Sequence, residues 1–339
     1  MKLLTCVVPC YNSAAYMERA VDSLLTGGEE IEVLIVDDGS SDETGEIADR
    51  LADKYPSIIR VHHQDNAGHG SAINHGIAHA QGVYFKVVDS DDRLLKENVP
   101  GLMDILRQHS DSENSVDLIF HDYVYDRPDR ENSFRITYAG KLKPDTVSDW
   151  DRCRPFHMWN QFMIHSMIYR TQFLRDIGLH LPEHTFYEDN LYIYQPLVYT
   201  RRIMYHHAPL YAYFVGRDDQ SIDEKNILKR LDQMTNITKA QITSYTLDEL
   251  NRVSPHLRKY MINNACGQLF TNCALQFIEN SERSRRMNSE MWQTIRDFDP
   301  ALYKRLRRNP LGRASCLPGR AGERLLVFMY RFGRRMISI

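Results

Sequence analysis

Apolar runs and amphipathic segments alternate along the first part of the chain. Short, near-continuous apolar runs predict buried strands, and apolar positions three or four residues apart predict helices. The predicted strands are 4–8, 31–36, 58–61 and 82–88. The predicted helices between them are 13–25, 40–55 and 71–80, the second beginning with a capping box of Ser40 and Glu43. Unbroken apolar strands separated by helices are typical of a parallel sheet with helices on both faces.

The pattern becomes mixed after Lys96 and helical in the last third of the chain. Further strands are predicted at 116–121, 166–169, 203–206 and 210–214, and further helices at 99–108, 171–177 and 188–199. Residues 122–162 are polar and aromatic without periodicity. From about Asp223 onward the apolar positions follow a helical period. We therefore predict an α/β domain at 1–222 and a helical C-terminal region at 223–339.

The composition is that of a folded protein whose charge is unevenly distributed. Of the 339 residues, 42% are hydrophobic and 26% are charged, which excludes disorder. The formal net charge of −3 gives no overall attraction to nucleic acid, so no nucleic-acid partner is expected. Residues 301–339 nevertheless contain ten Lys and Arg against the single acid Glu323, which is a charge of +9 and leaves −12 elsewhere. A basic segment of this kind indicates a partner of its own.

The end of this basic segment also predicts a location. Residues 324–339 combine Arg with aliphatic and aromatic side chains, which favours a helix lying on an anionic membrane surface. A helix packed on the first domain and a homodimer contact are the alternatives. No apolar run is long enough to predict a membrane span, and no export signal is visible. The six Cys have neither zinc nor disulfide spacing, which indicates a cytoplasmic protein, with the inner face of the plasma membrane as a peripheral location.

Three carboxylates follow the fourth predicted strand, in Asp89-Ser90-Asp91-Asp92. Like charges this close raise the cost of ionising one another, and a bound cation removes that cost. Because Mg²⁺ and Mn²⁺ prefer carboxylate and phosphate oxygens, Asp89 and Asp91 are candidate metal ligands. An acidic turn or a helix cap is the alternative. The cluster lies at the carboxyl end of a strand, where α/β sheets bind their ligands.

The ends of the first two strands and the loop before the third helix contain further candidates. Asp38 can accept a hydrogen bond from a ribose hydroxyl or a base N–H, or it can belong to a simple turn. Tyr11 can stack on a base with Asn12 as a polar partner, and neither G-x-G-x-x-G nor a P-loop pattern follows the first strand. Asn66 and Gly68 precede a helix whose N-terminus attracts anions. A buried turn aromatic and a flexible loop are the alternatives.

Two polar segments in the second half complete the set of candidates. Glu188 and Asp189 begin a helix, where acids complement the helix dipole. A buried carboxylate at this place could also act as a general base. Arg217 and Ser221 lie in a loop after the last predicted strand, where they could hold a diphosphate or could form a solvated hinge. The spacing of these residues does not decide between the readings.

Five motifs in order along about the first 220 residues resemble the family 2 inverting glycosyltransferases of GT-A fold. Each motif is weak by itself, whereas the ordered set is specific. The motifs are Val7–Asn12, Val36–Thr44, Asn66–Gly76, Val88–Asp92 and Tyr187–Asn190. One motif departs from the family pattern, because Ala72-Ile73-Asn74 stands where many relatives have Ala-Arg-Asn. The charge of that Arg would have to come from Lys86 or Arg217, or it is absent.

The resemblance implies roles in donor binding. Pro9 and Tyr11 would lie beside Asp38 and hold the nucleoside of a nucleotide-diphospho-sugar. Asp89 and Asp91 would form the D-x-D motif of the family, which contacts the ribose and the metal, with Asp91 as the main metal ligand.

The resemblance also implies roles around the sugar. Asp92 would lie close to the donor sugar, and Asp189 would be the catalytic base with Glu188 beside it. Arg217 and Ser221 would belong to the loop that often closes over the diphosphate.

These roles imply a hexosyltransferase of bacterial cell-envelope polysaccharide synthesis. It would move a sugar from a nucleotide donor, with UDP expected, to a hydroxyl of a glycan or lipid-linked acceptor. Mn²⁺ or Mg²⁺ would assist, and the anomeric centre would be inverted in one displacement. The alternatives are a catalytically silent protein that binds nucleotide-sugars or carbohydrates, and a metal-dependent phosphohydrolase that uses the acidic cluster.

Overall fold

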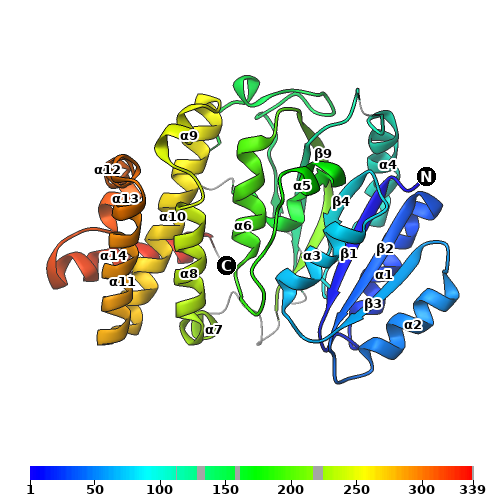
Figure 1. The fold of residues 1–339 in the computed structure, drawn as a ribbon, viewed down its shortest axis with the longest axis horizontal. Helices are drawn as coiled ribbons and strands as arrows, with labels where there is room; N and C mark the ends of the chain where they lie inside the picture. The colour runs from blue at the N-terminus through cyan, green and yellow to red at the C-terminus, as the bar shows by residue number, and fades with distance from the viewer. Residues whose placement is uncertain (112, 128–133, 157–160, 217–223, 338–339) are drawn as a thin grey trace. The chain divides into compact units, whose positions relative to one another are not determined.

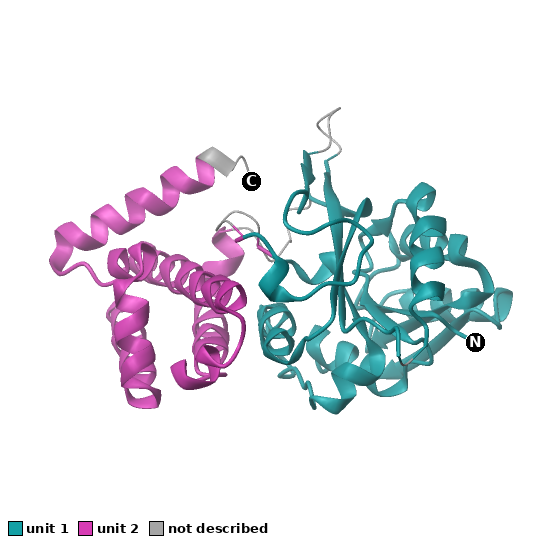
Figure 2. Ribbon diagram, turned by 90° about the horizontal axis from the view of Figure 1, so that it is seen from above, with its two compact units in different colours: residues 1–154, 162–217 teal, residues 155–161, 218–339 magenta. Residues whose placement is uncertain are grey.

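The computed structural model describes residues 1–111, 113–127, 134–156, 161–216 and 224–337. The chain divides into two compact units, coloured teal and magenta in Figure 2. Unit 1 consists of Met1–Arg154 and Phe162–Arg217, and unit 2 of Pro155–Gln161 and Asp218–Ile339. The domain boundary predicted at residue 222 lies outside the described residues.

Unit 1 combines strands and helices in alternation along most of its length. Its strands are β1 Leu4–Cys10, β2 Ile31–Asp38, β3 Ile59–Gln64, β4 Tyr84–Val87, β5 Arg93–Leu94, β6 Leu118–Asp126, β7 Phe134–Ile136, β8 Met167–Arg170 and β9 Ile203–Phe214. Its α-helices are α1 Met17–Leu24, α2 Thr44–Lys54, α3 His69–His79, α4 Val99–Gln108, α5 Thr171–Asp176 and α6 Asp189–Tyr194. The 3₁₀ turns are η1 Leu25–Glu30, η2 Lys96–Asn98, η3 Trp150–Arg152, η4 Ile164–Ser166 and η5 Gln195–Tyr199.

One sheet runs through unit 1 in the order β3-β2-β1-β4-β8-β6-β9-β5, with β7 paired to β6. The strands β3, β2, β1 and β4 are parallel to one another, as the unbroken apolar runs predict. Every residue of β1 and of β2 is buried, which explains the absence of polar alternation in these segments. The second half of the sheet is mixed, because β8 pairs antiparallel with both β4 and β6 while β6 and β9 are parallel.

Helices cover both faces of the parallel strands, as predicted (Figure 1). On one face, Cys6 and Val8 of β1 belong to a buried cluster with Val21 of α1, residues of α2 and Leu102 of α4. On the other face α3 packs against β1 and β2. Here Gly76 of α3 is essential to the close approach, since an added Cβ would lie 2.7 Å from Cγ2 of Val7. The α/β architecture therefore follows directly from the pattern of apolar strands.

Two details of the predicted elements are wrong for identifiable reasons. The helix predicted from residue 40 begins at Thr44, and no side chain caps it through the expected capping box. The Ser40 hydroxyl instead accepts a hydrogen bond from the backbone N–H of Asn12, at 3.0 Å. The two strands predicted at 203–206 and 210–214 are a single strand, β9, because a shift in register near Asp122 of β6 accommodates Pro209 without ending the pairing.

Unit 2 is helical, as predicted from residue 223 onward. Its helices are α7 Glu224–Lys229, α8 Leu231–Ile242, α9 Leu247–Asn251, α10 Pro255–Glu279, α11 Glu282–Phe298, α12 Pro300–Arg308, α13 Pro310–Ala314 and α14 Gly319–Ile337. The long helix α10 is central, because α8, α11, α13 and α14 all pack against it. Among the residues described, no helix has both the length and the apolar character that crossing a bilayer requires.

Candidate active site

The loops at the carboxyl ends of β1 and β2 are tied together by their side chains. The Asn12 carboxamide oxygen accepts from the backbone N–H of Ser41 at 2.9 Å, and Asn12 itself has a positive φ of 49°. Pro9 is buried within β1, whereas Tyr11 after it is 54% exposed. The result is an exposed aromatic ring on a hydrogen-bonded loop, which is a setting suited to stacking on a base.

Asp38 holds the loop that follows β3. Its carboxylate accepts hydrogen bonds from the backbone N–H groups of Ala67 and Gly68, both at 2.8 Å, and from the Gln64 amide at 2.7 Å. The Asn66 side chain donates to the Asp38 carbonyl at 2.9 Å. Asp38 is 3% exposed, so its negative charge is balanced by these donors. It connects two of the predicted motifs, while its contact with a nucleoside stays a prediction.

The acidic turn after β4 is fastened to β9. Asp92 is fully buried, and its carboxylate accepts from the Tyr211 hydroxyl at 2.6 Å and from the Phe214 N–H at 2.7 Å. Burial, together with the charges of Asp89 and Asp91, raises the pKa of Asp92 well above its usual range. Asp92 therefore anchors the turn, and its predicted place beside the donor sugar is untested. Asp89 and Asp91 are partly exposed.

The imidazole of His69, at the start of α3, joins the two acidic motifs. Its Nε2 lies 3.1 Å from a carboxylate oxygen of Asp89, and its Nδ1 lies 2.7 Å from a carboxylate oxygen of Glu188. These two acids are far apart in the sequence, since Asp89 follows β4 and Glu188 immediately precedes α6. His69 was not among the residues predicted from the sequence. The signal available was its place between Gly68 and Gly70 at a helix N-terminus, in a motif that was singled out for its glycines.

The charges of this cluster depend on one another. Burial lowers the pKa of His69, but the hydrogen bonds to Asp89 and Glu188 outweigh burial and raise it well above its usual value. Burial raises the pKa of Asp89, yet the interaction with His69 produces a net decrease. Burial and the charge of Glu188 raise the pKa of Asp189 to about 7. The cluster thus contains an imidazolium between two carboxylates, beside a carboxyl group that titrates near neutrality.

The segment before α6 is held close to the loop at the start of α3. The backbone N–H of His184 donates to the Ala67 carbonyl at 2.6 Å. An added Cβ on Gly70 would lie 2.6 Å from the Pro182 carbonyl and 3.0 Å from Cγ of Glu188. His184 and Tyr187 have positive φ values of 49° and 71°. Such backbone conformations are costly for residues other than glycine and collect at functional sites.

A buried polar layer lies beneath the acidic turn. Lys86 of β4 is fully buried, and its ammonium donates to the His165 carbonyl at 2.7 Å and lies 2.9 Å from Nε2 of His121. Burial lowers the pKa of Lys86 to about 7. Since its head group is fixed inside the sheet, Lys86 does not supply an exposed charge in place of the missing Arg. The other candidate for that charge, Arg217, lies outside the described residues, as does Ser221.

The donor set of the site fits a divalent ion that takes part of its shell from a ligand. In the described part of the chain, no three His, Cys, Asp or Glu side chains are placed to hold a metal by themselves. Asp89 and Asp91 offer carboxylate oxygens at the edge of the turn. Mg²⁺ and Mn²⁺ commonly bind through one or two carboxylates together with substrate phosphates. The residues are therefore suited to a metal that arrives with a nucleoside diphosphate.

Comparison with known proteins relates part of unit 1 to a protein family. Residues 5–165 match the family described as Glycosyl transferase family 2. The glycosyltransferase GlyG of Streptococcus pneumoniae serotype 4 is 37% identical over 138 residues, which are 40% of this chain and 44% of GlyG. Residues 5–165 belong to glycosyl transferase family 2. The glycosyltransferase EpsJ of Bacillus subtilis is 39% identical over 128 residues, 34% of this chain and 37% of EpsJ. This chain spans less than half the length of these curated relatives.

Solved structures confirm the fold. The TarS fragment 1–349 of S. aureus, in complex with UDP-GlcNAc, superposes with a TM-score of 0.65 at 18% identity, covering 98% of this chain and 92% of that fragment. The mannosyltransferase PcManGT from Pyrobaculum calidifontis, in complex with GDP-Man and Mn²⁺, gives a TM-score of 0.53 at 16% identity and covers 89% of this chain and 85% of that one. The GT-A fold with a helical C-terminal region is thereby confirmed.

The family 2 segment contains only part of the acidic cluster. Asp38, His69 and Asp89 lie inside the matched residues, whereas Glu188 and Asp189 lie beyond residue 165. The contacts of His69 with Asp89 and Glu188 connect the two parts within unit 1.

Proposed function

We propose that unit 1 transfers a sugar from a nucleotide-diphospho-sugar to a hydroxyl group of an acceptor. The observation that carries this proposal is the His69 bridge, which holds the D-x-D carboxylate Asp89 and the base motif at Glu188 in one cluster. The next residue, Asp189, has a pKa of about 7, so its carboxylate can accept a proton near neutral pH. It would do so beside Asp89, which would bind the donor. A turn or a helix cap alone would not require this convergence.

The donor in this proposal is a UDP-sugar. Tyr11 would stack on the uracil from its exposed position, with Asn12 and the loop of Asn66 and Gly68 bordering the nucleotide. The similarity of the fold to TarS, solved with UDP-GlcNAc, supports a uridine nucleotide. The backbone N–H groups at the start of α3 would add a favourable dipole toward the diphosphate.

Asp91 and Asp89 would hold Mn²⁺ or Mg²⁺ together with the donor phosphates. When bound, the ion supplies Lewis-acid stabilisation of the leaving diphosphate. His69 keeps one oxygen of Asp89 in place, and Asp92 keeps the turn on β9, so that the carboxylates are positioned before the donor binds.

The acceptor would lose its proton to the Asp189 carboxylate as the new glycosidic bond forms. The acceptor oxygen attacks the anomeric carbon from the face opposite the diphosphate, the bond from that carbon to the diphosphate oxygen breaks, and the configuration inverts. The charge of Glu188, which His69 contacts, would raise the pKa of Asp189 and so its basicity. The product of transfer from an α-linked donor would accordingly be the β-linked glycoside.

The acceptor class in this proposal is a glycan or lipid-linked glycan of the bacterial envelope. Such an acceptor would place the protein in the cytoplasm, with peripheral contact at the inner face of the membrane. The basic, aromatic helix α14 is the part of the chain suited to that contact.

A nucleotide-sugar screen by thermal unfolding, with Mn²⁺ held constant, tests the proposed function. A UDP-sugar at about 100 times its Kd should stabilise the protein by about 2.7 kcal/mol, which is a rise of several degrees in Tm. D91A should lose the Mn²⁺-dependent part of this rise, whereas D104A, an exposed carboxylate on α4, should keep it. Release of phosphate in the absence of an acceptor, with no preference among nucleotides, would indicate a phosphohydrolase. Stabilisation without transfer to any acceptor would indicate a silent binding protein, and no stabilisation would contradict donor binding.

A further inference from the structure

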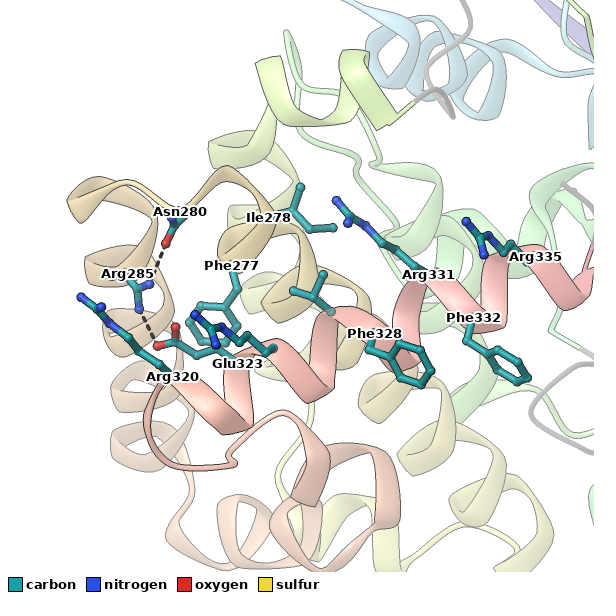
Figure 3. A pocket seen from close by; sticks show the side chains of 12 residues that line it. Phe277, Ile278, Asn280, Arg285, Arg320, Glu323, Phe328, Arg331, Phe332 and Arg335 are labelled. Atoms are coloured by element: carbon teal, nitrogen blue, oxygen red, sulfur yellow. Dashed lines mark hydrogen bonds and ion pairs between the residues drawn. The ribbon is translucent and has the colours of Figure 1, made fainter.

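Unit 2 contains a groove that combines arginines with aromatic side chains (Figure 3). Its volume is about 810 Å³, and α14 forms one wall. The end of α10 and the start of α11 contribute Phe277, Ile278 and Arg285. From α14 come Phe328 and Phe332 together with the four arginines 320, 324, 331 and 335. Five arginines against one acid, Glu323, make this groove strongly cationic.

The arginines of the groove fall into two groups. Arg285 is held in place, because its guanidinium is hydrogen-bonded to Glu323 and to Asn280, the latter at 2.7 Å. The four arginines of α14 that line the groove have no ion pair or hydrogen bond with any part of the chain that the structure describes, and all four are exposed; they are Arg320, Arg324, Arg331 and Arg335. Their charge is therefore available to an external anion.

Helix α14 has two apolar stripes, of which only one is covered. Leu326 is 1% exposed and Tyr330 is 7% exposed, and this stripe lies on the side that packs against α10. The other stripe consists of Leu325, Phe328, Met329 and Phe332, which are between 38% and 64% exposed. Large apolar side chains in a contiguous exposed row mark an interaction surface.

Helical spacing places the free arginines beside the uncovered stripe. Arg324, Arg331 and Arg335 are separated by seven and four residues, so they share one side of the helix. The row of Phe328 and Phe332 runs next to them and borders the same groove. A ligand that pairs with the arginines and also covers the phenylalanines must have a negative charge and an apolar portion side by side.

We propose that this groove binds the phosphate headgroup of anionic phospholipids, with the exposed stripe of α14 inserted among the acyl chains at the bilayer surface. The proposal deepens the peripheral membrane contact stated above, because it assigns the contact to a defined headgroup site. Charge complementarity selects an anionic lipid over a zwitterionic one, and guanidinium groups recognise phosphate by paired hydrogen bonds. The exposed apolar row favours a lipid over a soluble phosphate or a nucleic acid, because only the lipid has acyl chains to cover that row.

The proposal is tested by cosedimentation of the full chain with vesicles of phosphatidylcholine alone and with 30% phosphatidylglycerol. We expect binding to the anionic vesicles that weakens as salt rises, because salt screens surface charge. The variant R324Q/R331Q/R335Q should bind about a hundredfold more weakly, at about fivefold for each basic residue. F328S/F332S should also bind weakly, although all the arginines remain.

A matched control removes the same charge from elsewhere in unit 2. K259Q/R286Q/R296Q changes three exposed basic residues that do not line the groove, and it should bind like the parent chain. Equal binding of the groove variant and this control would contradict a headgroup site. Displacement of the protein from vesicles by millimolar glycerol phosphate would assign the groove to soluble phosphates instead of lipid. Dimers in solution that the groove substitutions dissociate would assign the surface to a second copy instead.

The outcome is independent of the catalytic proposal. Vesicle binding is measured without donor or acceptor, and hydrolysis or transfer of a soluble nucleotide-sugar is measured without vesicles. A groove variant that loses vesicle binding while it keeps nucleotide-sugar stabilisation would support the lipid site by itself. Failure of the parent chain to bind anionic vesicles at low salt would overturn the proposed lipid site. It would have no bearing on the proposed transfer reaction.

Discussion

At the scale of single residues, the acids of unit 1 act together because one imidazole lies between two of them. His69 contacts both Asp89 and Glu188, and its positive charge lowers the pKa of the neighbouring Asp189. Without this charge, three neighbouring carboxylates would repel one another, and each would resist ionisation. His69 is therefore a positioning residue that also sets the protonation of the proposed base.

Substitution of His69 by Gln should move the acid limb of the pH–rate profile to higher pH. The base is active when Asp189 is deprotonated, so activity should rise through about pH 7 in the parent chain. Removal of the imidazolium raises the pKa of Asp189 and reduces the rate at neutral pH. The measurement is the pH dependence of kcat/KM for donor turnover.

The control for this prediction is H63Q. His63 also bridges two carboxylates, those of Asp37 and Asp49, but it has no contact with the base motif in the described structure. The acid limb of H63Q should coincide with that of the parent chain. An unmoved limb in H69Q, or an equal shift in both variants, would show that the bridge does not control Asp189.

The sequence allowed the acids to be predicted but not the group that joins them. Asp89 and Asp91 were predicted as metal ligands from a short motif at a strand end, and Asp189 was predicted as the base from the family resemblance. His69 lies in a motif of which Asn66 and Gly68 were predicted to border the ligand, and its two partners are 20 and 119 residues away. Nothing in local spacing indicates that a single side chain spans that distance. Asp38 and Asp92 likewise have backbone partners that only the folded chain reveals.

At the scale of elements, α3 connects the site with the sheet. Its first turn provides Gly70 and His69, and its middle packs on β1 through Gly76. Two glycines in one helix reduce its intrinsic stability, yet both are needed for close approach. The helix therefore places the site at the edge of the sheet at the expense of local propensity.

Substitution of Gly70 by Ala should reduce turnover more than stability. The added methyl group would lie 2.6 Å from the Pro182 carbonyl and would push on Glu188, so the base segment must shift. A displacement of about 1 Å at a catalytic group costs on the order of a hundredfold in rate. The measurements are kcat and the urea midpoint of the same preparation.

The comparison for Gly70 is Gly101 in α4. An added Cβ there has no neighbour within 4 Å, so G101A should stabilise the protein by up to about 1 kcal/mol and leave kcat unchanged. Normal turnover in G70A would mean that the base segment is not packed against α3 as described.

Three stacked histidines should make the α3 region sensitive to acid. The rings of His62 and His75 stack at 3.5 Å, and those of His75 and His79 at 4.0 Å. Burial and the neighbouring histidines lower the pKa of His75 to about 4. The unfolded chain therefore binds more protons between about pH 6.5 and pH 4, and the free energy of unfolding falls as pH decreases through this window.

We expect H75Q to lose less stability than the parent chain between pH 7 and pH 5. The difference should be about 1 kcal/mol, since solvent screens part of the effect at a partly exposed ring. Urea unfolding at the two pH values measures it, with H180Q, an exposed histidine on the same unit, as the control. Parallel losses in the parent chain and H75Q would contradict this prediction.

The existence of most elements was predictable, and their ends were less so. Apolar runs at 4–8 and 31–36 predict β1 and β2 because both faces of these strands are buried. The start of α2 and the continuity of β9 depend on contacts with other segments. The Ser40 hydroxyl accepts a hydrogen bond from the Asn12 N–H instead of capping α2. A register shift in the pairing with β6 lets β9 continue through Pro209. Such competition between local and tertiary partners is invisible in a single segment.

At the scale of the whole molecule, two compact units have two kinds of surface chemistry. Unit 1 holds the acidic cluster, and unit 2 contains the cationic groove with its exposed aromatic row. The excess of basic residues after position 301 was visible in the sequence, whereas the groove was not, because it combines α14 with the end of α10. We therefore propose donor chemistry for unit 1 and lipid contact for unit 2.

The central claim is that acids from separate motifs form one glycosyl-transfer site with Asp189 as the base. The most direct test measures kcat for UDP-sugar turnover and donor affinity for D189N and for D176N, an exposed carboxylate on α5. D189N should lower kcat by about a thousandfold while the donor Kd changes by less than about twofold, and D176N should leave both values unchanged. Near-normal kcat in D189N, or an equal loss of donor affinity, would contradict the account.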